Sequence, residues 1–564
     1  MSLLDVRGLR VAYQGVAAVH GLGFQLEAGE TLALVGESGC GKSTTAQALM
    51  GLLPSNAQVS GLALFEGRDL LAMPARERRQ LQGNALGMVF QEPLSSLNPV
   101  LTLGEQVSEV LLAHSRLTRR QAWQRAEELL ALVQLPRPRQ HLHEYPHHLS
   151  GGQRQRVVIA MAIACEPRLL IADEPTTALD VSVQAQILKL LDRLRRELGM
   201  GVLLITHDLG VVAEQADRVL VMHDGHSLEH AGTRTLLNAP RHPYTQGLLK
   251  ASLGAAHQEH YLKARLPEIR VTRQSGQPNQ YAISDTRHNV APQAPATTGG
   301  LLEVRDLNLS YGERPVLNAL DLTLGPRESL GLVGESGCGK STLSKALLGL
   351  LEPSSGRIEY AGQNIATLSA AERLPWRRQV QMIFQDPAAA LNPRHSIDTL
   401  LDRVQRLHGQ ADARERLRER LRMLDAVGLP AASLQRLPHQ FSGGQRQRIG
   451  IARALILKPK LVICDEPVSA LDVSTQAQIL NLLVELREAF GLSYLFISHD
   501  LSVVRWFCDR VLVMHGGRIV EQATPDALWQ QPQHPYTRRL LAAIPGHATQ
   551  PYTPQPGLQF AVGW

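Results

Sequence analysis

The stretch Gly36-Glu37-Ser38-Gly39-Cys40-Gly41-Lys42-Ser43-Thr44 occurs twice in this chain of 564 residues, and its second copy runs unchanged from Gly334 to Thr342. Both copies fit the pattern G-x-x-x-x-G-K-[ST] of phosphate-binding loops. Each copy follows an apolar run that predicts a strand, at 31–35 and 329–333, and opens a helical pattern. A strand, a glycine-rich loop and a helix in this order are the setting in which such a loop binds phosphate.

The residue types of this stretch suit a nucleotide phosphate. Glycines allow backbone N–H groups to converge on phosphate oxygens at a helix N-terminus, where the helix dipole favours an anion. Lys42 and Lys340 are expected to reach the β- and γ-phosphates, and the hydroxyls of the following serines to bind Mg²⁺. The predicted nucleotide-binding residues are Gly36, Ser38, Gly39, Cys40, Gly41, Lys42, Ser43 and Thr44 in the first copy, and Gly334, Ser336, Gly337, Cys338, Gly339, Lys340, Ser341 and Thr342 in the second.

Composition narrows the class of protein. The chain is 44% hydrophobic and 20% charged, which is ordinary for a soluble globular protein. Its net charge of +6 is modest and no run of five Lys or Arg residues occurs, so no nucleic-acid partner is predicted. The five cysteines form no C-x-x-C pair, and the first residues do not resemble a signal peptide, which predicts a cytosolic chain. No apolar run approaches the roughly 18 residues of a membrane span, so any role at a membrane is expected to come through partner proteins.

The two copies of the loop belong to a longer internal repeat. Further matching residues keep their order in both halves at nearly constant spacing: Lys42 precedes Lys340 by 298 residues, and His207 precedes His499 by 292. This pattern predicts tandem duplication of one large domain rather than an array of short repeats. The predicted division is a first domain at 1–254, a linker or ordered appendage of the first half at 255–300, a second domain at 301–545 and a tail at 546–564.

Within each half, short apolar runs alternate with amphipathic helical patterns. The runs at 168–172 and 202–206 have counterparts at 461–464 and 494–498, and all four predict buried strands. Alternation of this kind predicts an α/β sheet covered by helices. Apolar residues at helical spacing in 117–135, and in the matching stretch 411–427, add a helix-rich insertion to each domain.

A second motif precedes a helical pattern in each half. A serine followed by two glycines at a helix N-terminus offers a hydroxyl and bare backbone amides to a phosphate. An ordinary helix N-cap is the alternative for each copy taken singly. The residues concerned are Ser150, Gly151, Gly152 and Gln153 in the first half, and Ser442, Gly443, Gly444 and Gln445 in the second.

Acidic residues end one predicted strand, and a histidine follows the next. Asp173 and Glu174, like Asp465 and Glu466, lie at the carboxyl end of a buried strand, where parallel sheets bind ligands. The aspartate suits the shell of Mg²⁺ and the glutamate suits the polarisation of an attacking water. His207 and His499 are placed to contact a γ-phosphate or that water, although a single histidine there would more often be structural.

These motifs, found in the same order twice, resemble those of ABC-transporter nucleotide-binding domains. The resemblance covers nearly all of the chain except the segment between the halves and the tail. It implies in each half a RecA-like α/β core with an antiparallel β-subdomain and a helical subdomain, with ATP and Mg²⁺ as cofactors. Gln91 and Gln385 match the glutamine of the family's Q-loop. Tyr13 and Tyr311 match the aromatic residue that stacks on adenine, although packing is the alternative role for a tyrosine there.

The resemblance also implies two composite ATP sites, each shared between the loop of one half and the Ser-Gly-Gly motif of the other. The first loop is expected to act with Ser442 and Gly444, and the second with Ser150 and Gly152. Both sites retain all matched residues, so both are predicted to hydrolyse ATP. The expected Mg²⁺ ligands are Ser43, Gln91, Asp173, Ser341, Gln385 and Asp465, and the expected catalytic residues are Glu174, His207, Glu466 and His499.

Two further segments resemble the oligopeptide/dipeptide/nickel branch of ABC importers. They are Phe90-Gln-Glu-Pro-Leu-Ser-Ser-Leu-Asn-Pro99 and the late His242-Pro-Tyr-Thr245, each repeated in the second half. The fused layout is similar to that of the ATPases of microcin C-type peptide and glutathione importers. This branch implies two transmembrane permease subunits, an extracytoplasmic substrate-binding protein and a peripheral position on the cytoplasmic face of the inner membrane.

Other functions are weaker interpretations of the same motifs. A nickel or metal-chelate importer is the main alternative for the cargo. A soluble twin ATPase acting on ribosomes fits less well, since the peptide-importer segments are present and a long charged helical linker between the halves is absent. A DNA-repair ATPase is disfavoured because zinc-binding cysteine pairs are absent.

Overall fold

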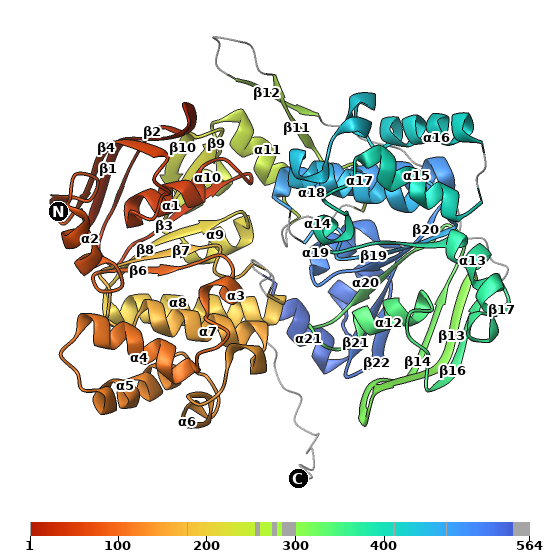
Figure 1. The fold of residues 1–564 in the computed structure, drawn as a ribbon, viewed down its shortest axis with the longest axis horizontal. Helices are drawn as coiled ribbons and strands as arrows, with labels where there is room; N and C mark the ends of the chain where they lie inside the picture. The colour runs from red at the N-terminus through yellow and green to blue at the C-terminus, as the bar shows by residue number, and fades with distance from the viewer. Residues whose placement is uncertain are drawn as a thin grey trace.

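The computed structural model describes residues 2–177, 179–253, 260–272, 279–284, 300–409, 412–469 and 471–544. The predicted tail and most of the segment between the halves lie outside the described residues. Two lobes of similar architecture lie side by side, the first built from the N-terminal half and the second from the C-terminal half (Figure 1). The duplication predicted from the repeated motifs is therefore visible as two matching domains.

A six-stranded sheet forms the centre of each lobe. In the first lobe its order is β10-β9-β3-β8-β7-β6, and in the second β18-β19-β20-β15-β21-β22. All neighbours are parallel except the edge pairs β9–β10 and β21–β22. The strands are β3 (Thr31–Gly36), β6 (Leu86–Val89), β7 (Leu169–Asp173), β8 (Gly201–Thr206), β9 (Arg218–His223) and β10 (His226–Gly232), then β15 (Ser329–Val333), β18 (Val380–Ile383), β19 (Leu461–Asp465), β20 (Ser493–Ile497), β21 (Arg510–His515) and β22 (Arg518–Ala523).

The central strands are buried along their whole length, as parallel strands covered on both faces must be. All residues of β3, β7 and β8 are buried, and so are those of β15, β19 and β20. This explains why their sequences are continuous apolar runs without alternation, and it confirms the strands predicted from those runs.

A smaller antiparallel sheet completes each core. Its order is β2-β1-β4-β5 in the first lobe and β14-β13-β16-β17 in the second. The strands are β1 (Leu4–Tyr13), β2 (Val16–Leu26), β4 (Ala57–Phe65) and β5 (Arg68–Asp69), then β13 (Leu302–Tyr311), β14 (Arg314–Leu324), β16 (Ser355–Tyr360) and β17 (Gln363–Asn364). Their apolar faces share one core cluster with the helix that follows the phosphate loop. The expected antiparallel β-subdomain is thus present.

Helices of the insertion form a separate cluster against the other side of the main sheet. In the first lobe it contains α4 (Leu103–His114), α5 (Arg119–Leu132), α6 (Pro138–His141) and α7 (Gly151–Ala162), and in the second α15 (Ile397–Leu407), α16 (Ala413–Ala426) and α17 (Gly443–Leu455). Helix α5 lies within the predicted range 117–135, and α16 within 411–427. The buried apolar residues Ala122, Ala126, Leu129 and Leu130 face this cluster, at the helical spacing that predicted it.

The remaining helices cover the sheets and the ends of the chain. They are α1 (Lys42–Met50), α2 (Ala75–Leu81), α3 (Pro93–Ser96), α8 (Val181–Leu198), α9 (Leu209–Gln215), α10 (Thr233–Asn238) and α11 (Pro243–Ala251), then α12 (Lys340–Leu347), α13 (Ala370–Gln379), α14 (Pro387–Ala390), α18 (Val473–Phe490), α19 (Leu501–Phe507), α20 (Pro525–Gln530) and α21 (Pro535–Ala542). Within the part of the chain that the structure describes, no helix is long and apolar enough to cross a membrane.

The ordered part of the segment between the halves spans both lobes. Its strands β11 (Glu268–Thr272) and β12 (Gln280–Ser284) form a hairpin that lies between the lobes near α11 and α18 (Figure 1). Tyr261 is buried in the core of the second lobe, whereas Ile269 joins a core cluster of the first. Side chains of 260–272 thus pack against both lobes, whereas the sequence predicted an appendage of the first half.

Candidate functional site

The two repeated loops wrap around their own lysines. Lys42 Nζ donates to the carbonyl oxygens of Gly36 at 2.7 Å and Glu37 at 2.8 Å, and Lys340 makes the same pair of bonds in the second lobe. A Cβ atom on Gly36 would lie 2.1 Å from the carbonyl oxygen of Met222, so only glycine fits between the loop and β9. The loop is thus held in a tight curve at the carboxyl end of β3.

The helix after each loop starts without a side-chain cap. The N-caps of α1 and α12 are Gly41 and Gly339, both in the left-handed conformation, and neither can supply a capping side chain. The first N–H groups of a helix have no partner within the helix, so here they are directed toward the space enclosed by the loop. Backbone donors and a helix dipole at this point suit the phosphates of a nucleotide.

Oxygen atoms suited to Mg²⁺ lie beside the first turn of each helix. Ser43 Oγ donates to Asp173 Oδ1 at 3.1 Å, which joins α1 to the end of β7. Burial raises the pKa of Asp173, and burial also raises the pKa of Asp465 in the second lobe. A hydroxyl and a buried carboxylate are hard oxygen ligands of the kind that Mg²⁺ takes. The residues present therefore fit the cofactor expected from the sequence.

Glu174 follows Asp173 and is held by three side chains. Its carboxylate accepts hydrogen bonds from Gln91 Nε2 at 2.9 Å and from Thr177 Oγ1 at 2.8 Å, and it lies 3.3 Å from Nδ1 of His207. Burial opposes its ionisation, but the hydrogen bond and charge of His207 outweigh burial and lower the pKa of Glu174 to about 2. The same ion pair raises the pKa of His207 although burial opposes this.

The second lobe repeats this arrangement. Gln385 Nε2 donates to Glu466 at 2.8 Å, and His499 Nδ1 lies 3.1 Å from the same carboxylate. Glu174 and Glu466 also share a left-handed backbone, with φ of 46° and 47°, which non-glycine residues rarely adopt. Local strain of this kind tends to occur at functional positions. The structure thus brings together the predicted glutamine, glutamate and histidine in both halves.

The two lobes meet through the residues that follow each glutamate. Asp180 Oδ1 accepts hydrogen bonds from the backbone N–H of Ser336 at 2.8 Å and from its hydroxyl at 2.9 Å. Ser182 Oγ donates to Glu335 at 2.7 Å, also across the interface. In the reverse direction Ser38 N–H donates to Asp472 at 3.4 Å, a longer bond. The halves of one chain therefore pair with each other. The phosphate loop of each half contacts residues that follow the strand-end glutamate of the other half.

A cavity of about 290 Å³ lies at the second loop. Its lining combines Lys340, Gln385, Glu466 and His499 of the second lobe with Asp180 of the first. Residues of two halves thus border one space next to the phosphate loop.

The Ser-Gly-Gly motifs lie at helix starts. Ser150 and Ser442 are the N-caps of α7 and α17, each in a capping box with the glutamine three residues later. The side chain of Ser150 does not line the cavity at the second loop. A Cβ atom on Gly152 would lie 2.4 Å from Val183 of α8, so this glycine is needed for packing within its own lobe. The part of these motifs in a shared site stays a prediction.

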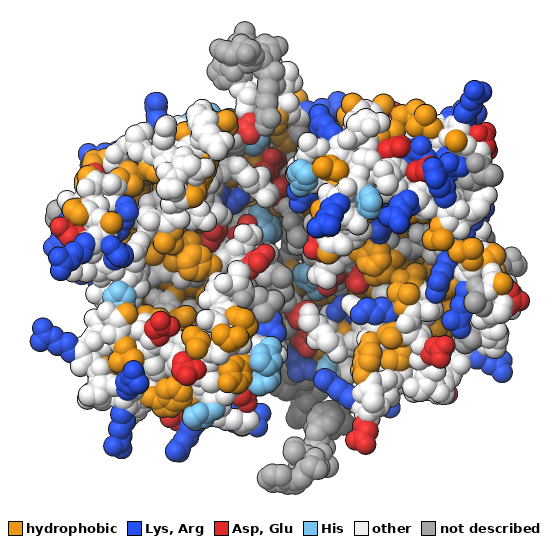
Figure 2. All heavy atoms as spheres, viewed as in Figure 1, with side chains coloured by type: hydrophobic (Ala, Val, Ile, Leu, Met, Phe, Trp, Pro, Cys, Tyr) orange, Lys and Arg blue, Asp and Glu red, His pale blue; other side chains and the backbone are white. Residues whose placement is uncertain are grey.

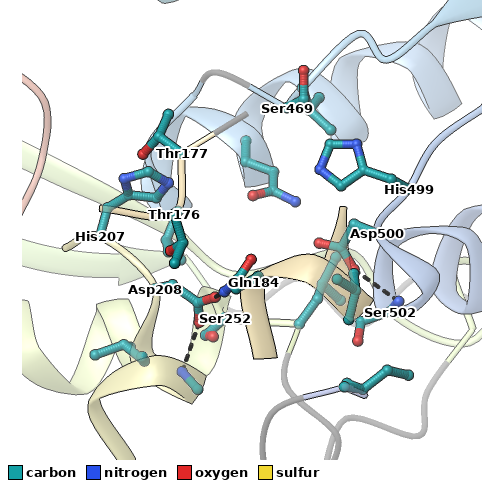
Figure 3. A pocket seen from close by; sticks show the side chains of 18 of the residues that line it. Thr176, Thr177, Gln184, His207, Asp208, Ser252, Ser469, His499, Asp500 and Ser502 are labelled. Atoms are coloured by element: carbon teal, nitrogen blue, oxygen red, sulfur yellow. Dashed lines mark hydrogen bonds between the residues drawn. The ribbon is translucent and has the colours of Figure 1, made fainter. Parts of the chain in front are cut away.

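A second cavity, of about 170 Å³, lies between the lobes (Figure 3). His207 and Thr177 border one side of it, and His499 and Ser469 the other. Asp208 faces the same space and accepts a hydrogen bond from Gln184 Nε2 of α8 at 3.1 Å. The two predicted histidines thus lie across one polar cavity, close to the boundary between the halves.

The two tyrosines predicted to stack on adenine differ in environment. Tyr13, at the end of β1, is partly buried against the core of the antiparallel sheet. Tyr311, at the end of β13, is 49% exposed. Stacking on adenine stays a prediction for both.

Sequence reasoning missed two kinds of contact. Thr177 follows Glu174 by three residues, and its bond to that carboxylate has no sequence signal beyond its position. Glu335 and Tyr536 contact each other through the N–H of Glu335 and the hydroxyl of Tyr536 at 2.9 Å. The His-Pro-Tyr-Thr stretch, repeated in register, is a signal for this contact, but in the sequence it indicates only the branch of importers and no structural partner.

Models of two protein families match the chain. The model described as ABC transporter matches residues 19–177 and 317–469. The chain belongs to this family. A second model, described as oligopeptide/dipeptide transporter, C-terminal region, matches residues 228–275 and 520–556 of this ABC ATPase.

Similar full-length proteins support the same conclusion. Proteins named glutathione import ATP-binding protein GsiA from Escherichia coli K12, Salmonella typhimurium LT2 and Pectobacterium atrosepticum are each 46% identical to this chain. Each alignment covers 96% of this chain and 89% or 90% of the relative. The protein is therefore an ATP-hydrolysing subunit of an ABC importer, as the repeated motifs predicted.

Proposed function

We propose that this ABC ATPase holds two composite ATP sites and drives the import of peptides or peptide-like compounds. The observation that carries the proposal is the reciprocal contact between the halves: Asp180 meets the second phosphate loop, and Asp472 meets the first. Support for the cargo class comes from the relatives named for glutathione import and from the oligopeptide/dipeptide C-terminal regions. We propose residues 1–254 and 301–545 as the two nucleotide-binding domains.

The residues of each site have separate roles. Loop N–H groups and Lys42 hold the phosphates in the first site, and Ser43, Asp173 and Gln91 hold Mg²⁺, which when bound offsets phosphate charge. Glu174, whose pKa is low, is ionised at neutral pH and orients and polarises a water for attack on the γ-phosphate. His207 keeps Glu174 ionised, and a γ-phosphate that drew His207 away would leave this carboxylate free to contact the water.

The second site has the same parts. Lys340, Ser341, Asp465 and Gln385 take the binding roles, and Glu466 with His499 the catalytic roles. We infer that ATP draws Ser442 and Gly444 toward the first loop, and Ser150 and Gly152 toward the second, which closes the lobes around two nucleotides. Binding energy is thereby converted into a shift between open and closed populations.

The subunit is proposed to act on two transmembrane permease subunits. An extracytoplasmic substrate-binding protein is proposed to deliver the substrate to these permeases. Apolar side chains near each Q-loop support this docking: Phe90 and Phe384 are each 40% exposed. Hydrophobic side chains are exposed on the face of both lobes that Figure 2 shows. The proposed location is therefore peripheral, on the cytoplasmic face of the inner membrane.

A trapped complex tests both parts of this proposal. The Glu174→Gln/Glu466→Gln double variant should bind ATP without hydrolysing it, and we expect it to co-purify from detergent with two hydrophobic permeases. Wild-type chain without ATP is the matched control. Ligands released by the cognate binding protein are then identified. Peptides or thiol peptides would support the cargo proposal, whereas a metal chelate would overturn it in favour of metal-chelate import. Recovery of ribosomal proteins without permeases would overturn the transport role.

A further inference from the structure

The His-Pro-Tyr-Thr stretches at 242–245 and 534–537 start the last helix of each lobe. In the second lobe His534 is the N-cap of α21, its Nδ1 accepts the N–H of Tyr536 at 3.2 Å, and Pro535 occupies the first helical position. Proline is favoured at this position because its missing N–H would have no partner there. Histidine and proline thus define where the helix begins.

A glutamate on the neighbouring strand fixes the same helix start from the other side. Glu521 of β22 accepts the N–H groups of Gln533 at 2.7 Å and His534 at 2.9 Å. The first lobe repeats this with Glu229 of β10, which accepts the N–H groups of Arg241 at 2.8 Å and His242 at 3.1 Å. Because these bonds hold the start of the stretch, the tyrosine has a defined direction.

That direction leads to the phosphate loop. Tyr536 is 2% exposed, and its ring centroid lies 4.0 Å from that of His515 at the end of β21. Its hydroxyl accepts the backbone N–H of Glu335 at 2.9 Å. Glu335 is the second residue of the loop 334–342, so the C-terminal region of the protein is bonded directly to the loop backbone.

The other half of the protein holds the side chain of the same residue. Ser182 Oγ donates to the Glu335 carboxylate at 2.7 Å, and Asp180 accepts the N–H of the next residue, Ser336, at 2.8 Å. Helix α21 also lies against α8, the helix that carries Ser182 (Figure 1). Glu335 is therefore held through its N–H by Tyr536 and through its carboxylate by the first lobe.

The matching tyrosine of the first lobe differs. Tyr244 is fully buried, and the N–H of Glu37 lies beside its hydroxyl, but that hydroxyl makes no hydrogen bond of normal geometry. Its ring contacts His223 and Tyr281, the latter from the hairpin between the halves. The first loop is thus packed against an aromatic cluster where the second loop is hydrogen-bonded.

We propose that Tyr536 is a positioning residue of the second ATP site, which fixes the start of the phosphate loop against the C-terminal region and the opposite lobe. The inference rests on the proposed assignment of 334–342 as an ATP-binding loop. Removal of the hydroxyl leaves the N–H of Glu335 without its partner and lets the loop leave the curve that its phosphate-binding N–H groups need. Nucleotide affinity of the second site should fall, while that of the first site should not.

The test measures MgADP binding by calorimetry on the full-length chain carrying Lys42→Ala. This substitution disables the first loop, so the binding that remains comes from the second loop. Adding Tyr536→Phe keeps the ring and should weaken MgADP binding about fivefold, the effect of one net hydrogen bond. Tyr494→Phe is the matched control: Tyr494 is a fully buried tyrosine of the same lobe whose hydroxyl donates to the Leu483 carbonyl at 2.9 Å, within the core rather than at the loop. It should lower the melting temperature as much as Tyr536→Phe does and leave binding unchanged.

Two further variants complete the design. Glu521→Gln, which weakens the anchor of the helix start, should reduce MgADP affinity in the same direction. Tyr244→Phe, measured in a Lys340→Ala chain, should change affinity of the first loop less than twofold, since the contact of its hydroxyl with the Glu37 N–H lacks normal hydrogen-bond geometry. The inference is overturned if Tyr536→Phe and Glu521→Gln both leave affinity unchanged, or if Tyr494→Phe reduces it equally. Failure of the Lys42→Ala chain itself to bind MgADP would instead overturn the assignment of the second loop.

Discussion

The contact of Asp180 with the second phosphate loop gives the sharpest test of coupling between the halves. Asp180 accepts two hydrogen bonds from Ser336, at 2.8 and 2.9 Å, whereas its counterpart Asp472 accepts one from Ser38 at 3.4 Å. A net hydrogen bond is worth about 1 kcal/mol, and the exposed position of Ser336 argues against a larger value. Asp180→Ala should therefore cost the second site about 2 kcal/mol, and Asp472→Ala should cost the first site less than 1 kcal/mol.

Rates of the separate sites make this difference measurable. In a Glu174→Gln chain the remaining hydrolysis comes from the second site, and in a Glu466→Gln chain from the first. We expect Asp180→Ala in the former to reduce kcat/KM for ATP about 30-fold, since 1.36 kcal/mol corresponds to a factor of ten. Asp472→Ala in the latter should reduce it less than fivefold. Equal losses, or a larger loss from Asp472→Ala, would refute the interpretation that the two contacts differ in strength.

The remaining predictions concern stability. The low pKa of Glu174 adds stability above about pH 4.5 that is lost as pH falls toward 2, and the raised pKa of His207 adds stability below about pH 6.5 that is lost as pH rises through its folded pKa. The wild-type melting temperature should thus fall from pH 6 to pH 8.5 more steeply than that of His207→Gln, and parallel curves would contradict this. Tyr261 is 2% exposed and bonded to Asp509 and Arg487, so Tyr261→Ala should destabilise the second lobe by about 3–5 kcal/mol in calorimetric unfolding, whereas exposed Tyr311→Ala should change it little.

Motif spacing predicted most of the fold and the composition of each site, because those features depend on short stretches of sequence. A buried parallel strand must be a continuous apolar run, and the loop after β3 must be glycine-rich to pass under Met222, so both were visible in the sequence. The partners of Glu174 were visible in part: Gln91 and His207 follow neighbouring strands whose ends meet at one edge of the sheet. Thr177 was missed because a threonine in a turn carries no pattern of its own.

Contacts between the halves could not be predicted in the same way. The position of Tyr261 in the core of the second lobe depends on where Trp506 and Phe507 lie, more than 240 residues later in the chain. The unequal bonds of Asp180 and Asp472 arise although the residues before them are nearly identical, since small differences in how the lobes pack decide which hydrogen bonds form. Repetition in the sequence therefore predicted equal sites, and the structure shows similar sites with unequal contacts across the interface.

The proposed base of the first site lies close in sequence to a residue that contacts the second loop. Glu174, the proposed base of the first site, and Asp180, which holds the loop of the second site, are only six residues apart. The backbone of Glu174 is fixed at its own end by a bond from its N–H to the carbonyl of Ile205 at 2.9 Å. Thr177, between these two residues, also holds the Glu174 carboxylate through a hydrogen bond of 2.8 Å. If nucleotide binding moves the second loop, this short connection would carry the movement to the segment that holds the proposed base of the first site, and linkage would make the effect on binding reciprocal.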